Sequence, residues 1–138
     1  MKRKKYSPEK ILAYLKIKSL NEMQQEAINA NENGSDLIVL SATGSGKTLA
    51  FLLPILENLE ENDPNTQALI IVPSRELAMQ IEHVFKQMKT GKKITATYGG
   101  HKREIEENNL VQPPAVIVGT PGRLGDHIRR GNITIDSI

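Results

Sequence analysis

The chain has 138 residues, of which 38% are hydrophobic and 25% charged, and this composition predicts a single globular domain. Its net charge of +2 and pI near 8.9 are only mildly basic and do not by themselves indicate a nucleic-acid partner. The sequence has no cysteine, which excludes disulfides and thiolate metal sites, and it has no apolar run long enough to span a membrane. We therefore expect a cytoplasmic protein with no membrane partner.

A basic cluster at residues 2–5 opens the chain. It is typical of a solvated terminus, and a nucleic-acid-binding arm is the alternative. Ser7 and Pro8 then predict the start of a short helix, with serine as the cap and proline at the first helical position. A second helix is expected from Asn21, and the turn residues at 33–34 end this entry segment.

The segment from Asp36 to Thr48 has the pattern of a strand, a glycine-rich loop and a helix start. Leu37 to Leu40 form a short apolar run, which predicts a buried parallel strand. Gly44 to Gly46 would let backbone N–H groups approach phosphate oxygens closely, and the helix start adds unpaired donors. The Lys47 ammonium would reach the β- and γ-phosphates, and the Thr48 hydroxyl would ligate Mg²⁺.

This segment matches the phosphate-loop pattern incompletely. The full pattern requires glycine where Ser41 stands, so Ser41 must adopt a negative φ, which a residue at the end of a strand can do. An ordinary glycine-rich turn between a strand and a helix is the alternative. The expected strand before the loop and helix after it favour the phosphate loop.

After this segment, short apolar runs alternate with helical patterns. Pro54 predicts a kink or an early end of the helix that Lys47 opens, and the polar residues 57–67 predict a surface loop. Strands are expected at residues 68–72, 94–98 and 115–118, and further helices are expected to begin at Ser74, Lys102 and Thr120.

This alternation predicts a parallel sheet with helices on both faces. Right-handed crossovers bring every strand-to-helix junction to the same edge of such a sheet, where ligands bind. The expected junctions are residues 43–48, 73–77, 99–100 and 120–123, and one nucleotide cannot occupy all of them. A second polyanion, such as a nucleic-acid backbone, would explain the remaining junctions. The alternative is that Ser74 and Thr120 only cap their helices.

Five short motifs follow one another along the chain: MQQEAI at 23–28, SATGSGKT at 41–48, VPSRELAMQ at 72–80, YGG at 98–100 and VGTPGR at 118–123. Together they resemble the first RecA-like domain of a DEAD-box ATP-dependent RNA helicase over nearly the whole chain. The resemblance implies an α/β fold, a three-layer RecA-like P-loop NTPase domain with a mostly parallel sheet that is incomplete here. Residues 1–30 would form the Q-motif helices and residues 36–138 the P-loop core. The Asp-Glu-Ala-Asp segment of the family would follow shortly after Ile138, with a second RecA-like domain beyond it, so we expect a fragment that lacks both.

The resemblance also implies roles for particular residues. Gln24 resembles the adenine-reading glutamine of the family, and a capping box with Asn21 is its alternative role. Two larger groups match the phosphate loop (Thr43, Gly44, Ser45, Gly46, Lys47 and Thr48) and the contacts to the RNA backbone (Ser74, Arg75, Gly99, Gly100, Thr120, Pro121, Gly122 and Arg123). Backbone contacts position a nucleic-acid strand without reading its sequence. The chain departs from the family pattern at Ser74, where threonine is usual, and at residues 20–22, which replace a proline- and threonine-rich lead-in.

The leading hypothesis is a fragment of an ATP-dependent RNA helicase. It would bind ATP and Mg²⁺ through Lys47 and Thr48, and RNA, as a single strand or short duplex, at the neighbouring helix starts. The full-length parent would hydrolyse ATP, and the fragment alone is expected to be inactive because the acidic motif is missing. The alternatives are a non-catalytic nucleotide- or RNA-binding module and a DNA helicase of a related superfamily, since residue chemistry does not separate RNA from DNA here.

Overall fold

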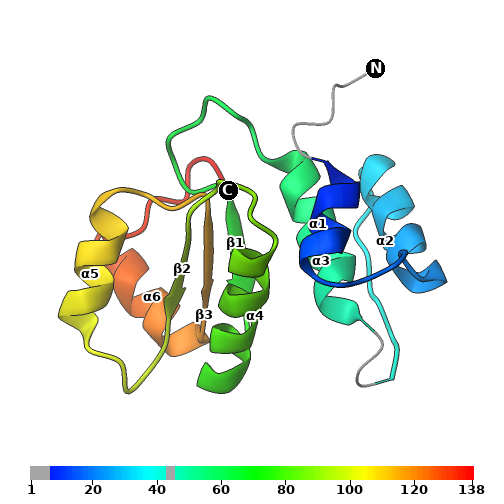
Figure 1. Ribbon diagram of the computed structural model, residues 1–138. Helices are drawn as coiled ribbons and strands as arrows, with labels where there is room; N and C mark the ends of the chain where they lie inside the picture. The colour runs from blue at the N-terminus through cyan, green and yellow to red at the C-terminus, as the bar shows by residue number, and fades with distance from the viewer. Residues whose placement is uncertain (1–6, 43–45) are drawn as a thin grey trace. The chain divides into compact units, whose positions relative to one another are not determined.

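The structure is a computed structural model that describes residues 7–42 and 46–138 (Figure 1). It divides the chain into two compact units, Met1–Leu59 and Glu60–Ile138. We refer to them as the N-terminal unit and the C-terminal unit. Among the described residues, no helix has the length and apolar character needed to cross a bilayer.

The N-terminal unit consists of α1 (Pro8–Tyr14), α2 (Glu22–Glu32) and α3 (Lys47–Asn58). The predicted caps are present, since the Ser7 hydroxyl accepts the Lys10 N–H at the start of α1 and the Asn21 side chain accepts the Gln24 N–H at the start of α2. α2 packs against α3, and the buried face of α3 carries most of the core of this unit, which includes Ala27, Leu49, Ala50, Leu52, Leu53 and Leu56.

α3 runs through Pro54 to Asn58, so of the two effects expected of the proline, a kink or an early end of the helix, the early end does not occur. Proline removes one N–H donor from the helix ladder. Here Pro54 lies on the buried face with Leu53 and Leu56, and this burial offsets the lost hydrogen bond.

The predicted strand at Leu37–Leu40 does not form, which corrects the sequence analysis. The segment is irregular, and the side chains of Ile38 and Leu40 are 86% and 91% exposed. A strand exists only through hydrogen bonds to a neighbour. The strand pairs of the described chain join β1, β2 and β3 of the C-terminal unit and none of them includes this segment, so its apolar composition is not enough to order it as a strand.

The C-terminal unit contains β1 (Ala68–Ile71), β2 (Ile94–Thr97) and β3 (Val116–Gly119), all parallel and in the order β1-β3-β2. Figure 1 shows α4 (Arg75–Gln87) on one face of this sheet and α5 (Arg103–Val111) and α6 (Pro121–Arg129) on the other. The predicted α/β arrangement, a parallel sheet covered on both faces, is therefore confirmed for these strands.

The core of this unit forms around β3, the central strand, in which every residue is buried. On the α5 and α6 face, Ile117 packs with Leu110, Leu124 and Ile133. α4 packs against β2 and β3 and buries Ala78, Ile81 and Phe85. A strand that is apolar on both faces is what a covered parallel sheet requires.

The strand register aligns the carboxyl ends of the three strands. Gly119 of β3 pairs with Ile71 of β1 and with Thr97 of β2. A Cβ added at Gly119 would lie 2.5 Å from the Thr97 carbonyl oxygen, so only glycine fits this close approach. The three loops that follow the strands therefore leave the sheet at one level, as predicted for these junctions. The fourth expected junction, residues 43–48, does not follow any of the described strands.

Candidate functional site

The start of α3 carries the predicted phosphate-binding residues of the N-terminal unit. Gly46 is the N-cap residue, with φ of +88°, and Lys47 and Thr48 are the first two residues of the helix. The first N–H groups of a helix have no partner within it, and Gly46 contributes no side-chain acceptor to them. Lys47 is exposed and Thr48 is half-buried. This arrangement suits an anion, because N–H donors, the positive end of the helix dipole and an ammonium group occur together.

Gln24 lies against this helix start and is 4% exposed. Its Oε1 accepts the Asn21 N–H at 2.9 Å, and its Nε2 donates to the Gly46 carbonyl oxygen at 3.1 Å. The capping box considered as the alternative role is thus present. The same amide also connects α2 to the phosphate-loop residue Gly46, which a capping box alone does not require.

The donor groups at this helix start are of the kinds that would hold a phosphate group and a metal ion. A Cβ at Gly46 would lie 2.5 Å from Gln24 Nε2, so only glycine allows this close approach of the helix start to Gln24. Lys47 would hold the phosphates, and Thr48 would hold the metal ion through its hydroxyl. The other predicted loop residues, Thr43, Gly44 and Ser45, lie outside the described residues.

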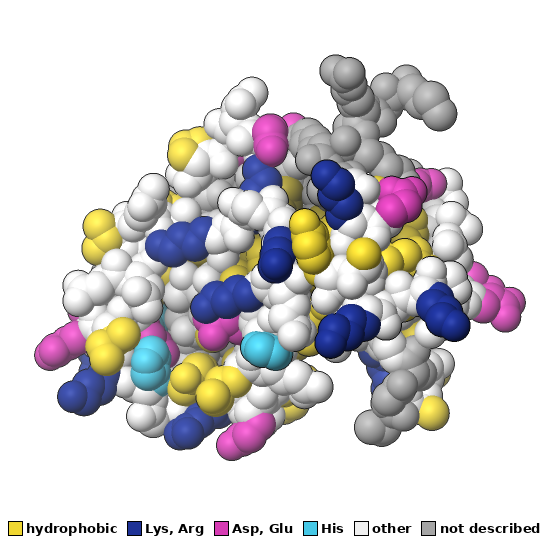
Figure 2. All heavy atoms as spheres, viewed as in Figure 1, with side chains coloured by type: hydrophobic (Ala, Val, Ile, Leu, Met, Phe, Trp, Pro, Cys, Tyr) yellow, Lys and Arg dark blue, Asp and Glu magenta, His cyan; other side chains and the backbone are white. Residues whose placement is uncertain are grey.

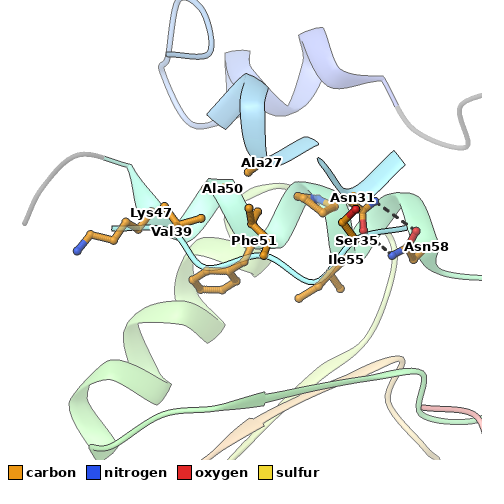
Figure 3. A pocket seen from close by; sticks show the side chains of 11 residues that line it. Ala27, Asn31, Ser35, Val39, Lys47, Ala50, Phe51, Ile55 and Asn58 are labelled. Carbon is orange, nitrogen blue, oxygen red and sulfur yellow. Dashed lines mark hydrogen bonds between the residues drawn. The ribbon is translucent and has the colours of Figure 1, made fainter. Parts of the chain in front are cut away.

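A cavity of about 390 Å³ runs along α3 within the N-terminal unit (Figure 3). Its walls are mainly apolar and include Val39, Phe51 and Ile55. Asn31 and Asn58, which hydrogen-bond to each other, lie at one end, and the Lys47 side chain extends away at the other. The apolar lining does not suit phosphate, so we assign the anion site to the helix start and not to this cavity.

In the C-terminal unit, the first junction of the sheet edge leads from β1 into α4. The Ser74 hydroxyl accepts the Leu77 N–H at 3.2 Å, so Ser74 does cap its helix. Arg75, the first residue of α4, is exposed, and its guanidinium carbon lies 5.7 Å from the centre of the Tyr98 ring. Gly100, at φ of +86°, lies beside the Arg75 side chain. Two predicted sites, Ser74–Arg75 and Gly99–Gly100, are therefore neighbours.

The second junction leads from β3 into α6. Thr120 is the N-cap of α6 and Pro121 its first residue, as predicted, and Pro121 and Gly122 are exposed. The Thr120 side chain makes no capping hydrogen bond. Arg123 differs from the expectation, because its side chain is only 16% exposed and its Nη1 donates to the Glu106 carboxylate at 2.9 Å and to the His101 carbonyl at 3.0 Å.

Glu106 of α5 is the centre of a buried polar cluster that the sequence analysis missed. Its side chain is 0% exposed. Oε1 accepts from Arg123 Nη1 and from His127 Nε2, and Oε2 accepts from the Tyr98 N–H and from His101 Nδ1. The four bonds are 2.8–3.0 Å long and occupy the four acceptor positions of a carboxylate.

The protonation states of this cluster follow from its hydrogen bonds. Burial alone raises the pKa of Glu106, but hydrogen bonds from His127, the Tyr98 amide and His101, together with the charge of Arg123, outweigh burial and lower that pKa below its usual value. Asn132 Nδ2 donates to His127 Nδ1 at 3.1 Å, so the His127 ring carries its proton on Nε2. Glu106 is therefore ionised and accepts a hydrogen bond from His127 Nε2.

The sequence holds a weak signal for this cluster. Glu106 precedes Leu110 by four residues, and His127 follows Leu124 by three, so each polar residue shares a helix face with a core leucine. A charged residue in a charged helix is ordinarily solvated. Only the presence of four donors around it makes the burial of Glu106 favourable, and two of them, Arg123 and His127, come from positions 17 and 21 residues away in the chain.

Figure 2 shows several Lys and Arg side chains across the middle of the face in view, with most acidic side chains nearer its margin. One acidic residue, Asp126, is paired with Arg130 at 3.0 Å and lies near Arg103 at 3.6 Å.

The family model described as DEAD/DEAH box helicase matches residues 21–138. The chain belongs to this family. The match includes Gln24, Gly46, the sheet and all three of its junctions, so the resemblance stated from the motifs is confirmed at the level of the family. It does not test the role of any single residue.

Several relatives are similar in sequence. The chain is 37% identical over 132 residues to the ATP-dependent RNA helicase DeaD of Haemophilus influenzae, covering 94% of this chain and 22% of that protein. It is 40% identical over 119 residues to the ATP-dependent RNA helicase DeaD of Escherichia coli K12, covering 84% of this chain and 19% of that protein. The chain therefore spans about a fifth of the length of these relatives.

Two solved structures share the fold. One is a hypothetical ATP-dependent RNA helicase from Sulfolobus tokodaii, at 30% identity and a TM-score of 0.80, which covers 96% of this chain and 39% of that one. The other is the yeast DEAD-box splicing factor Prp28, at 28% identity and a TM-score of 0.83, with 93% and 32% coverage. These similarities confirm the predicted RecA-like helicase fold.

Proposed function

We propose that this chain is part of an ATP-dependent RNA helicase, in which it binds ATP·Mg²⁺ at the start of α3 and the RNA backbone at the sheet edge of the C-terminal unit. Residues 1–30 are the Q-motif helices and residues 36–138 the P-loop core in this proposal, and the protein acts in the cytoplasm together with a second RecA-like domain. The observation that carries the proposal is membership of the helicase family, combined with Gly46, Lys47 and Thr48 at the start of a helix.

The nucleotide part of the proposal assigns one task to each residue. The N–H groups at the start of α3 and Lys47 bind the phosphates, and Thr48 ligates the metal ion. Gln24 reads adenine through the second hydrogen on Nε2 and the second lone pair on Oε1, since each atom has one partner already. Adenine presents a matching acceptor and donor at N7 and N6, whereas guanine presents two acceptors.

Isothermal titration calorimetry with ADP·Mg²⁺ and GDP·Mg²⁺ tests this part. We expect ADP to bind more tightly by ~1–3 kcal/mol, the value of a bidentate base contact. Gln24→Ala should remove the preference, and Gln25→Ala is the matched control, because Gln25 is the exposed neighbour on the same helix. Equal affinities for the two nucleotides would contradict adenine reading.

The RNA part of the proposal uses the aligned strand ends. Ser74, Arg75, Gly99, Gly100, Thr120, Pro121, Gly122 and Arg123 all follow strands that end at one level of the sheet. Arg75 is exposed there, and backbone N–H groups at the starts of α4 and α6 can donate to phosphate oxygens. Contacts of this kind bind all sequences about equally.

Titration of single-stranded RNA at several salt concentrations tests this part. Arg75→Ala should weaken binding for all sequences and flatten the dependence of log K on log salt by ~0.7, the value for one lost phosphate contact. Arg129→Ala is the matched control, because Arg129 is also exposed but lies in the last turn of α6. A loss confined to particular RNA sequences would contradict backbone binding.

Hydrolysis of ATP would require groups beyond Lys47 and Thr48 at the start of α3. Phosphoryl transfer to water needs Mg²⁺ held from both sides and an oriented water. Lys47 and Thr48 supply one side. Asp63 lies in a loop, where it accepts the Asn65 N–H, and Asp126 is paired with Arg130, so neither suits the other side. We therefore expect no RNA-stimulated ATP turnover by this chain, and turnover that Lys47→Ala abolishes would refute this expectation.

A further inference from the structure

Glu106 connects the two segments of the sheet edge that carry most of the proposed RNA contacts. One segment, residues 98–101, follows β2 and supplies the Tyr98 N–H and the His101 ring. The other, residues 120–123, follows β3 and ends at Arg123, which bonds to the same carboxylate. Because Glu106 is fully buried, it contacts both segments from behind and is not itself available to a ligand.

Of the two arginines proposed to contact RNA, Arg123 and Arg75, only Arg123 is bonded directly to Glu106. Both of its hydrogen bonds, to Glu106 and to the His101 carbonyl, start from Nη1. Arginine has five N–H donors, so within the described part of the chain those on Nε and Nη2 stay available to a phosphate. The planar guanidinium cannot rotate while Nη1 is held by two partners, and its free edge is therefore fixed in direction.

Arg75 is held through a longer series of contacts. The His101 ring, bonded to Glu106, stacks on the Tyr98 ring with 5.1 Å between the ring centres. Tyr98 in turn lies under the Arg75 guanidinium, 5.7 Å away. The Tyr98 backbone is also fixed by Glu106. The position of Arg75 thus depends on the same buried carboxylate as that of Arg123.

The energetics of a buried charge also favour a role in geometry. A buried ion pair often adds little net stability compared with apolar side chains of the same volume, because desolvation of the charges offsets their attraction. What the buried Glu106 carboxylate provides is a fixed geometry, because four donors must converge on its two oxygen atoms. An apolar side chain at position 106 could fill the same space but could not orient Arg123 or the 98–101 turn.

We propose that Glu106 is a positioning residue for RNA binding: it holds the 98–101 turn and Arg123 in the one arrangement that binds an RNA backbone, without touching the RNA. This inference rests on the proposed RNA-binding function. It differs from a purely stabilising role, which would change the melting temperature of the chain but not the affinity of the folded protein for RNA.

The test is an NMR titration of the ¹⁵N-labelled chain with a single-stranded uridine oligonucleotide, which measures weak binding. Glu106→Gln keeps the shape of the side chain but replaces one acceptor oxygen with an amide donor, and should weaken binding about 10-fold and flatten the salt dependence by ~0.7. Glu104→Gln, an exposed change on the same helix, should leave the dissociation constant within about twofold, on the basis that an exposed glutamate contacts neither segment.

Two further variants separate positioning from stability. Ile133→Val destabilises the core cluster behind the sheet and should leave RNA affinity unchanged below its melting temperature. In an Arg123→Ala background, Glu106→Gln should weaken RNA binding by a smaller factor than in the unmodified chain, since only the 98–101 turn and Arg75 are then left for Glu106 to position. If Glu106→Gln does not fold, His101→Phe, which keeps the ring stack and removes one bond to Glu106, should weaken binding severalfold.

The outcomes distinguish this inference from the function on which it rests. If RNA at millimolar concentration changes no chemical shift in the spectrum of the unmodified chain, the proposed RNA-binding function is wrong, and the inference about Glu106 is wrong with it. If the unmodified chain binds and Glu106→Gln, or His101→Phe in its place, binds equally well, the inference alone is overturned. A weaker affinity for Glu106→Gln with unchanged affinities for Glu104→Gln and Ile133→Val would support it.

Discussion

Replacing Gly46 with alanine would measure how far the start of α3 depends on its close approach to Gln24. At φ of +88°, a left-handed conformation costs an L residue about 1–2 kcal/mol. The new Cβ would lie 2.5 Å from Gln24 Nε2, so the amide must move and its bond to the Gly46 carbonyl is lost, at a further cost of ~0.5–1.5 kcal/mol. We expect Gly46→Ala to lower the free energy of unfolding by about 1.5–3.5 kcal/mol, the sum of the two contributions.

Gly34→Ala is the matched control for this change. Gly34 is also left-handed, at φ of +71°, but an added Cβ there meets nothing within 4 Å. Gly34→Ala should therefore lower the free energy of unfolding only by the cost of the left-handed backbone conformation, about 1–2 kcal/mol. Urea unfolding followed by circular dichroism measures both, since the chain has no tryptophan. If Gly46→Ala and Gly34→Ala lowered the free energy of unfolding equally, the steric argument would be refuted. In a Gln24→Ala background, the two glycine substitutions should lower the free energy of unfolding by the same amount.

Three other predictions address the anion site, the sheet and acid stability. Lys47→Ala should weaken ADP·Mg²⁺ binding about 10-fold or more, because a charged hydrogen bond contributes ~1.5–3 kcal/mol, and calorimetry that shows an unchanged affinity would contradict the assigned role. Thr97→Val should raise the free energy of unfolding by ~1 kcal/mol, because the buried Thr97 hydroxyl has no hydrogen-bond partner among the described residues. Thr66→Val is the matched control and should lower the free energy of unfolding by a similar amount, because it removes the hydrogen bond from the Thr66 hydroxyl to the Pro114 carbonyl. The pKa of Glu106 is lower in the folded than in the unfolded chain, so its contribution to stability is complete above its ordinary pKa of 4.5 and is lost as the pH falls through the folded value. Urea midpoints measured from neutral pH into acid should show this loss in the unmodified chain and a smaller one in Glu106→Gln.

Local signals were enough to predict most helices and three of the four strands. Ser7, Asn21 and Ser74 cap the helices that they were expected to begin, since a cap is a bond between residues three positions apart. The apolar runs at 68–72, 94–98 and 115–118 became strands because the crossover helices bring them side by side.

The errors of prediction concern information that is not local. The run at residues 37–40 is as apolar as the others, but none of the described strands pairs with it. The topology correctly predicted that the residues following the strands lie at one sheet edge. It did not predict that Arg123 is bonded to Glu106, which lies seventeen positions earlier in the chain. Neither pairing nor burial of a carboxylate can be read from a segment alone, because both depend on what the rest of the chain brings next to it.

The position of β3 in the centre of the sheet has a consequence for synthesis. Among the described strands, β1 and β2 have no partner until β3 is available, because in the order β1-β3-β2 they do not pair with each other. About 50 residues separate the end of β1 from the end of β3, which at ~5–20 residues per second is roughly 2–10 s of translation. During that interval β1, with Ile71 at its end, is an apolar segment with two open edges on a nascent chain. Chaperones that bind short apolar segments would therefore find their target in residues 68–71 before the chain reaches Gly119, and would lose it once β3 pairs.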